Sequence, residues 1–329
     1  MMTGSTQSRS AVRLPGIEAL RFFAALCILL LHTRAVFGGQ PVFGRGYLAV
    51  EFFLMLSGFL MAYAQEARIS EPAHFMVKRY TRLWPTMALG GVIGLPRLYL
   101  KSAGLGEFLA TALANLALIP AWWAKFVFAL NIPAWTIFYE LVANALHVLI
   151  FRHLKLWVIG LAIALLAPVM VWIGHGWGSF DVGAKPGDFL AGLPRILFAY
   201  LIGIALGRMW RGGTPIPVPP LLAIPAMPVI LAGAWWFKLD QTWHFDMAFT
   251  VLACPLMIAG GMRLTRFHRA AGLLGQLSFP LFAVQMPILE GMHMLGFNGW
   301  EAGFAALAGG VLAAQLTQWF KRWRKEKTA

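Results

Sequence analysis

The sequence predicts an all-α membrane protein that crosses the bilayer about ten times. Hydrophobic residues make up 59% of the 329 residues and charged residues only 12%, whereas a soluble domain has about 25% charged residues. Ten apolar stretches are each long enough to cross roughly 30 Å of hydrocarbon as a helix. No repeat or linker divides the chain, so we expect one transmembrane domain over 16–320, between a short tail (1–15) and a basic tail (321–329).

The apolar stretches place the individual spans. An additional stretch, 107–121, is short and runs into the sequence IPAWWAK, so we expect it to be re-entrant or interfacial rather than spanning. The N-terminus carries no small-residue cleavage site, so the first span is expected to be a helix of the mature protein. The ten predicted spans are 16–36, 46–66, 83–99, 135–151, 156–174, 190–209, 219–237, 246–262, 272–295 and 301–320.

The distribution of lysine and arginine predicts the orientation, because these residues collect in cytoplasmic loops. With ten spans and both termini in the cytoplasm, 18 of the 27 lysine and arginine residues are cytoplasmic and seven lie outside. If 107–121 also crossed, every later loop would change sides. Orientation in a lipid bilayer also explains the net charge of +14 better than nucleic acid does, since no basic binding motif is present.

Ionisable residues at membrane depth are the main candidates for function, because burial of charge in lipid is costly. The predicted topology places His32, Glu51, Glu140 and Arg195 in the outer half of the membrane. A neutral His32 could act as a base, with Glu51 orienting its ring. The alternative is a structural salt bridge, for example between Arg195 and Glu140. The full set is Arg21, His32, Glu51, Glu140, Arg195, Glu290 and His293.

Two further patterns carry chemistry. Arg21 and His32 are eleven positions apart, which puts them on one helix face with a rise of about 16 Å between them. Arg79 and Arg82 lie at the cytoplasmic mouth of the third span, with Pro85 expected near its first turn; they suit either anionic lipids or a phosphate.

The sequence also argues against several other sites. The Ser-Gly pair at Ser57 favours close helix packing over a nucleophile, since no G-x-S-x-G elbow surrounds it. Cys27 and Cys254 lie in apolar runs, so we expect no disulfide between them. No cysteine or histidine has the spacing of metal ligands, so we expect no metal.

Six segments in order resemble the membrane-bound acyltransferase 3 family, whose first helix has an arginine and a histidine separated by ten residues. The resemblance covers residues 16 to about 290. The segments are GIEALRFFAALCILLLH (16–32), GYLAVEFFLMLSGFLM (46–61), KRYTRLWP (78–85), PAWTIFYELVANAL (133–146), PRILFAYLIGIALGR (194–208) and LGQLSFPLFAVQMPIL (274–289).

The resemblance implies O-acylation, most often acetylation, of a cell-surface or exported carbohydrate by cytoplasmic acyl-CoA at a bacterial inner membrane. It implies that His32 is the catalytic residue, and that Arg21, Arg79 and Arg82 bind the donor. Glu51 and Glu140 are expected in the catalytic site. Trp135, Arg195 and Gln285 are expected to contact substrate.

One departure from the family pattern leaves other functions open. Gln285 stands where the family often has a histidine, and Phe279 and Phe282 replace tyrosines. Glutamine forms hydrogen bonds but does not shuttle a proton at neutral pH. The alternatives are a non-catalytic partner of polysaccharide-synthesis proteins, or a transporter that uses the same charges, although the inverted repeats typical of transporters are absent.

Overall fold

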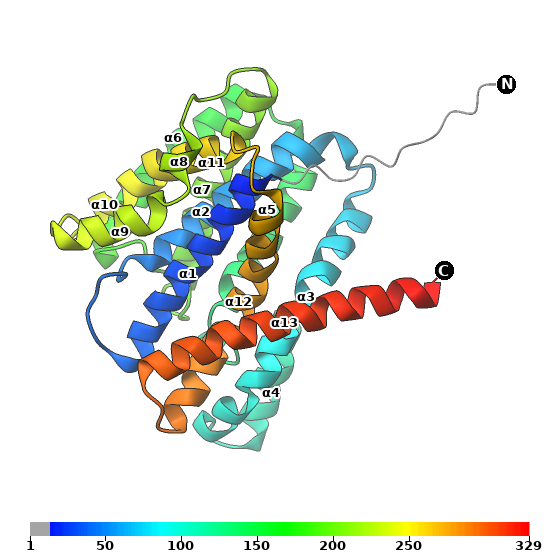
Figure 1. The fold of residues 1–329 in the computed structure, drawn as a ribbon, viewed down its shortest axis with the longest axis vertical. Coiled ribbons are helices and arrows are strands. Elements are labelled where there is room, and N and C mark those ends of the chain that lie inside the picture. Colours follow the sequence, from blue (N-terminus) through cyan, green and yellow to red (C-terminus); the bar gives the residue numbers. More distant parts are fainter. Residues whose placement is uncertain (1–13, 329) are drawn as a thin grey trace.

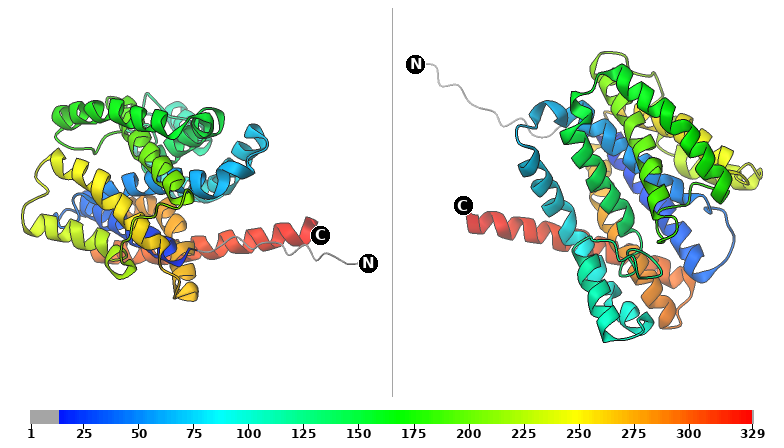
Figure 2. Two further views of the ribbon diagram at one scale, coloured as in Figure 1. Left: turned by 90° about the horizontal axis from the view of Figure 1, so that it is seen from above. Right: turned by 180° about the vertical axis from the view of Figure 1, so that it is seen from behind.

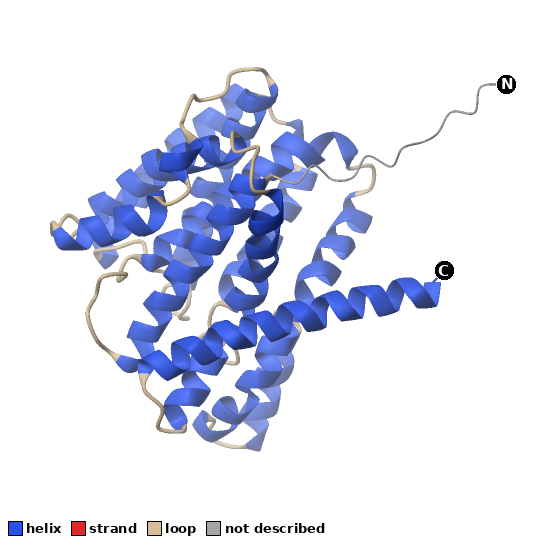
Figure 3. Cartoon of the chain, viewed as in Figure 1, coloured by secondary structure: helices blue, strands red, loops and turns tan. Residues whose placement is uncertain are grey.

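The computed structural model describes residues 14–328, which form helices, turns and loops without a β-strand (Figures 1 and 3). Most of the predicted tail 1–15 lies outside this part. In chain order, with η marking short 3₁₀ or π turns, the helices are α1 (Pro15–Phe37), η1 (Gly46–Leu48), α2 (Ala49–Leu60), η2 (Met61–Gln65), η3 (Glu66–Arg68), α3 (Pro72–Lys101), α4 (Leu105–Leu116), α5 (Ala134–Leu149), η4 (Phe151–His153), α6 (Leu156–Trp177), α7 (Phe189–Arg211), α8 (Pro220–Ala223), α9 (Ala226–Trp236), α10 (Trp243–Ala248), η5 (Phe249–Ala253), α11 (Cys254–Met262), α12 (His268–Met294) and α13 (Gly299–Thr328).

Within residues 14–328, seven helical stretches are long and apolar enough to cross a membrane. The other three predicted spans are occupied by α3, by α8 with α9, and by α13. The prediction of an all-α polytopic membrane protein is therefore confirmed. The seven stretches are Pro15–Phe37, Gly46–Arg68, Ala134–His153, Leu156–Trp177, Phe189–Arg211, Trp243–Met262 and His268–Met294.

Two of the remaining predicted spans differ from expectation for physical reasons. α3 begins at Pro72, far before the predicted start at 83, so Pro85 lies inside the helix and not in its first turn. The basic residues in the early turns of α3 lower the hydropathy there, so a search for apolar stretches misses these turns. Basic residues do not prevent helix formation. The span predicted at 219–237 is broken into α8 and α9 at Pro225, because proline cannot continue the backbone hydrogen-bond pattern.

The segment 105–133 enters the molecule and returns, as predicted for its apolar part. α4 runs back along α3, where the Trp84 indole donates a hydrogen bond to Leu116 O (2.7 Å). The irregular chain that follows returns to Arg97, which donates to Ala129 O (3.0 Å). Such backbone survives at membrane depth only where its polar groups are paired. Asn115 pairs them, with hydrogen bonds to Ile119 O (3.2 Å), Val127 O (3.0 Å) and the Leu130 amide (3.0 Å).

The helices around the centre define two ends of the molecule. We call the end where α1, α3 and α12 begin the proximal end, and the other the distal end (Figure 1). α1 and α12 run side by side in the same direction. A Cβ on Gly275 would lie 2.7 Å from the Glu18 Cβ near the proximal end. The Phe37 ring lies 5.1 Å from the His293 ring near the distal end.

α2 and α13 run in the opposite direction to α1 and α12. α2 begins near the distal part of α1, because a Cβ on Gly46 would lie 2.6 Å from Cys27 O. α13 crosses α12, and Gln318 donates a hydrogen bond to Gln276 near the proximal end (2.6 Å). α6 and α13 lie on opposite sides of the molecule (Figure 2). This arrangement leaves α1, α2 and α12 at the centre, next to α3.

Candidate active site

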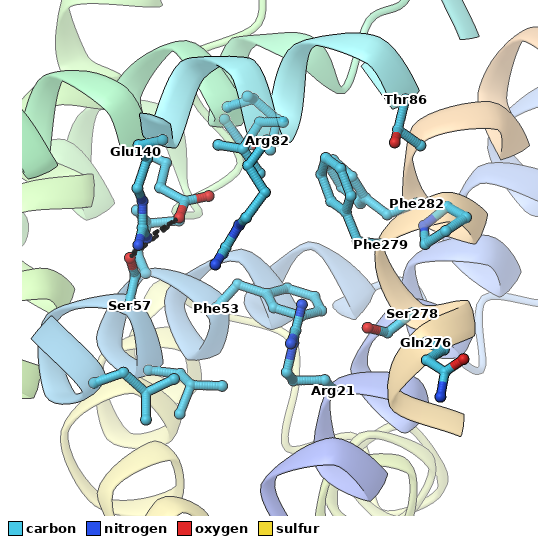
Figure 4. A pocket seen from close by; sticks show the side chains of 18 of the residues that line it. Arg21, Phe53, Ser57, Arg82, Thr86, Glu140, Gln276, Ser278, Phe279 and Phe282 are labelled. Carbon is cyan, nitrogen blue, oxygen red and sulfur yellow. Dashed lines mark hydrogen bonds and ion pairs between the residues drawn. The ribbon is translucent and has the colours of Figure 1, made fainter. Parts of the chain in front are cut away.

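A cavity of about 450 Å³ lies between α1, α2, α3, α5, α12 and α13. Side chains from all six helices line it, and Figure 4 shows several of them converging on one space. The cavity falls within the size range of small-molecule sites. Its polar or charged lining residues are Arg21, Ser57, Gln65, Arg79, Arg82, Thr86, Thr136, Glu140, Gln276, Ser278, Thr317 and Gln318.

The lining changes from polar to apolar along the cavity. On one face of α2, Val50, Phe53, Ser57 and Leu60 all contribute, followed by Gln65. From Val50 to Leu60 the helix rises about 15 Å. Because α2 runs towards the proximal end, Gln65 marks that end of the cavity and Val50 marks the distal end.

The lining contributed by α3 also changes from charged to apolar towards the distal end. Because α3 runs away from the proximal end, its charged residues come first in the sequence. Its lining residues begin with Arg79 and Arg82 and continue through Leu83 to Thr86. On α12, Gln276 precedes Phe282 in the same sense. The charged and amide groups therefore gather at the proximal part of the cavity, while the distal part is mainly apolar.

Arg79 is the best-fixed charge in the cavity. Its Nη2 lies 2.7 Å from Glu140 Oε1 and donates to Ser57 Oγ (2.9 Å). Ser57 in turn donates to Glu140 Oε1 (3.2 Å). The Arg79 Nε atom is buried without a partner among the described residues. This N–H donor of a fixed guanidinium is therefore unsatisfied among the described residues.

The cavity carries more positive charge than its own carboxylate can neutralise. Arg21 and Arg82 project into it from opposite sides (Figure 4). Neither has an ion pair or hydrogen bond elsewhere in residues 14–328, and Glu140 is the one carboxylate in the lining. Three guanidiniums against one carboxylate suit an anion with several oxygens, because guanidinium groups bind phosphate oxygens in pairs.

His32 and Gln285 lie beyond the distal part of the cavity and do not line it. His32 Nδ1 is buried without a hydrogen-bond partner among the described residues, as are both amide atoms of Gln285. α1 and α12 lie side by side, with Glu18 against Gly275 near one end and Phe37 against His293 near the other. With this register, Gln285 of α12 lies level with the part of α1 that is about one turn before His32. Unpaired buried polar groups are rare and call for an explanation.

Comparison with known proteins now assigns the family. The family described as "Acyltransferase domain" (acyltransferase 3) matches residues 14–319. The chain belongs to this acyltransferase family. The resemblance predicted from the sequence is thus confirmed, and the protein is an acyltransferase.

Two curated relatives differ in how much of the chain they match. "Acyltransferase MdmB" of Streptomyces mycarofaciens is 24% identical over an alignment that covers 93% of this chain and 87% of the relative. "Protein 2 in picA locus" of Rhizobium radiobacter is 32% identical over 40% of this chain and 78% of the relative. No solved structure matches the chain.

The structure corrects the expected partners of the acyltransferase's buried charges. Arg195 does not pair with Glu140; its Nε and Nη2 donate to Glu51 (2.5 and 3.1 Å). Glu51 was also expected to orient the His32 ring, and no hydrogen bond joins it to His32 Nδ1 within residues 14–328. The Arg195–Glu51 pairing follows from the heights of these residues along the molecule. Glu51 lies near the distal start of α2, beside Arg195 near the start of α7. Glu140 lies further from the distal end, next to Arg79.

Arg195 is held in a buried hydrogen-bond network in this acyltransferase. Its other hydrogen bonds go to the backbone oxygens of Val182 (2.8 Å) and Tyr47 (3.3 Å). The Trp135 ring covers the guanidinium at 5.3 Å. Arg195 is 1% exposed, and neither it nor Trp135 lines the cavity.

Ser57 is a site residue whose position the sequence analysis missed. We expected the Ser-Gly pair to serve helix packing, and Gly58 does: a Cβ there would lie 2.1 Å from Tyr200 O of α7. Ser57 itself faces the cavity, between Arg79 and Glu140. The 100° turn between successive residues of a helix separates the two roles, and this signal was already present in the sequence.

Other ionisable groups of the acyltransferase lie outside the cavity. Glu290 pairs with Arg97 (2.8 Å) near the distal end. Cys27 and Cys254 are both free and buried. Among the described residues, no group of three histidine, cysteine or acidic side chains is placed to hold a metal ion.

Proposed function

We propose that this membrane acyltransferase transfers an acyl group, acetyl in the first instance, from acyl-CoA to a hydroxyl of a cell-surface or exported carbohydrate. The observation that carries the proposal is the cavity itself, with three arginines at the proximal part and apolar side chains at the distal part. This order matches a donor with phosphates at one end and an acyl thioester at the other.

The donor phosphates would lie against Arg21, Arg79 and Arg82. Arg79 is held by Glu140 and Ser57, so its guanidinium is oriented before the ligand arrives. Glu140 is thus a positioning residue in this proposal. The donor's arm would extend along the α2 face from Leu60 towards Val50, a rise of about 15 Å.

His32 would supply the base. Its ring removes the proton from the acceptor hydroxyl, the resulting alkoxide attacks the thioester carbonyl, and the C–S bond breaks to release CoA thiolate, which takes up the proton. Direct acylation of His32, followed by transfer to the hydroxyl, gives the same products. The unpartnered amide of Gln285 is suited to hold the acceptor hydroxyl, since it both donates and accepts hydrogen bonds.

The proposed orientation places the proximal end in the cytoplasm of a bacterium, with the protein in its inner membrane. Acyl-CoA is cytoplasmic, so the arginines would meet the donor on that side. His32 lies further towards the distal end, where an exported carbohydrate would arrive. Proteins of polysaccharide synthesis are the partners expected to supply this acceptor.

The experiment measures free CoA released from acetyl-CoA by the purified protein in lipid nanodiscs, with and without an acceptor glycan. We expect release to depend on the glycan, and we expect His32→Ala to abolish it while the variant still inserts and binds CoA. His293→Ala is the matched control, because His293 lies on α12 near the distal end and outside the cavity. Acyl transfer that survives in His32→Ala would overturn the assignment.

A further inference from the structure

Two glutamines are paired at the proximal part of the cavity. Gln318 of α13 donates a hydrogen bond from its Nε2 to Gln276 Oε1 of α12 (2.6 Å), and both side chains line the cavity. Gln276 is exposed and Gln318 is half-buried. Figure 4 shows Gln276 at the edge of the cavity, away from Ser57 and Glu140. The pair is thus accessible to a ligand that fills the cavity.

The pair presents one hydrogen-bond donor beside one acceptor. The Gln276 amide nitrogen and the Gln318 amide oxygen make no other hydrogen bond to the described residues. Rotating both amides by a half-turn would reverse their order but would again leave one donor beside one acceptor. The neighbouring Ser278 and Thr317 hydroxyls already donate to backbone oxygens (2.9 and 2.7 Å). The two amides are therefore the groups of this wall that remain available to a ligand.

The glutamine pair lies level with Arg82. α3 and α12 both run from the proximal to the distal end, and the Gly90 backbone of α3 packs against Ala283 O of α12. Arg82 is eight residues before Gly90, and Gln276 is seven residues before Ala283. Because each residue of a helix adds the same rise, Arg82 and Gln276 lie at nearly the same height. A phosphate bound to Arg82 would have the glutamines near it.

A donor beside an acceptor matches the edge of an adenine base. Adenine carries its N6 amine, a donor, between two ring nitrogens that accept, and glutamine amides bind this edge through two hydrogen bonds. In CoA only a ribose separates the adenine from the nearest phosphates. A CoA whose phosphates meet Arg82 therefore brings its adenine to the glutamine pair, while its thioester arm extends the other way, towards His32.

We propose that the Gln276–Gln318 pair binds the adenine of the acyl-CoA donor. The Gln318 amide oxygen accepts from the N6 amine, and the Gln276 amide donates to the adjacent ring nitrogen. The inference rests on the proposed acyl-CoA donor. The pair makes this enzyme select its donor by the base, in addition to the phosphates and the thioester.

The test measures the dissociation constants of CoA and etheno-CoA for the protein in lipid nanodiscs. The etheno bridge joins N6 to N1 and removes the N6 donor, but it leaves the phosphates and the thiol arm unchanged. We expect wild type to bind etheno-CoA about tenfold more weakly than CoA, since paired hydrogen bonds to adenine distinguish bases by about this factor or more. The double variant Gln276→Leu with Gln318→Leu should bind the two ligands alike.

Gln315→Leu is the matched control. Gln315 lies on α13 close to Gln318, but it is exposed and does not line the cavity. This variant should keep the wild-type ratio of the two dissociation constants. A pair that only fastened α12 to α13 would give a different result in the double variant. The melting temperature would fall and both ligands would bind more weakly, with their ratio unchanged, which would overturn the adenine site.

The outcomes separate the two proposals. Wild-type protein that binds neither CoA nor etheno-CoA would overturn the proposed donor and this inference with it. Wild-type protein that binds both equally well, or a ratio that Gln315→Leu abolishes as completely as the double variant does, would overturn the adenine site alone and leave the donor assignment standing.

Discussion

At the scale of single residues, the three cavity arginines differ in what holds them. Arg79 is fixed by Glu140 and Ser57, whereas Arg21 and Arg82 have no ion pair within residues 14–328. A side chain without a partner contributes little to folding. Its loss should therefore be seen in ligand binding and not in stability.

Arg82→Gln tests this difference. We expect the dissociation constant for CoA to rise about tenfold or more, because hydrogen bonds to charged groups contribute about 1.5–3 kcal/mol. The melting temperature in detergent should not change. The matched control is Arg266→Gln, at an exposed arginine between α11 and α12, which should alter neither quantity. Equal weakening by both variants would indicate general attraction of charge, not a phosphate site.

Glu51→Gln tests whether the Glu51–Arg195 pair is structural. Removing one partner of a buried ion pair leaves the other charge unpaired and costs about 3–5 kcal/mol. We expect that loss in the free energy of unfolding, with acyl transfer per folded molecule retained. Glu71→Gln, at an exposed glutamate, is the control. A variant as stable as wild type but inactive would instead support the catalytic role that the sequence suggested for Glu51.

At the scale of elements, Asn115 fixes the re-entrant segment between α4 and α5. Asn115→Leu keeps the size of the side chain but removes three hydrogen bonds, leaving the buried Leu130 amide without that partner. We expect a loss of about 1–3 kcal/mol and faster proteolysis within 117–133. Gln241→Leu, at an exposed loop, should cause neither. Unchanged proteolysis in Asn115→Leu would show that packing alone holds the segment.

The sequence predicts these elements better than it predicts their partners. Hydropathy located the spans, since the requirement for about 20 apolar residues acts within each helix. Hydropathy missed the first turns of α3, because basic residues lower the mean hydropathy there. It also missed the break at Pro225, because a single proline hardly changes the mean hydropathy of an apolar run. The Arg195 pairing could not be derived either. It depends on the relative height of α2, α5 and α7, which no single helix encodes.

At the scale of the whole molecule, the cavity exists only where six helices meet. Arg79 and Arg82 suggested a phosphate patch, and Phe282 stood out only as a replacement for a tyrosine. Phe53 and the glutamines of α12 and α13 carry no pattern that a sequence reader could recognise. The position of His32 outside the cavity was also unexpected. A helix face gives the direction of a side chain, whereas the extent of a cavity depends on every neighbouring helix.

The orientation of the whole molecule determines which compartment supplies the donor, and it can be measured directly. Cys27 and Cys254 are at most 1% exposed, so the wild-type protein provides an almost unreactive background. We expect Ala103→Cys, in the distal loop between α3 and α4, to react with a membrane-impermeant maleimide in intact cells. Thr265→Cys, in the proximal loop before α12, should react only after permeabilisation. Both sites are exposed, so a difference in labelling reports the side of the membrane. The reverse pattern would put Arg21, Arg79 and Arg82 on the outer side, away from cytoplasmic acyl-CoA, and would exclude the proposed donor route.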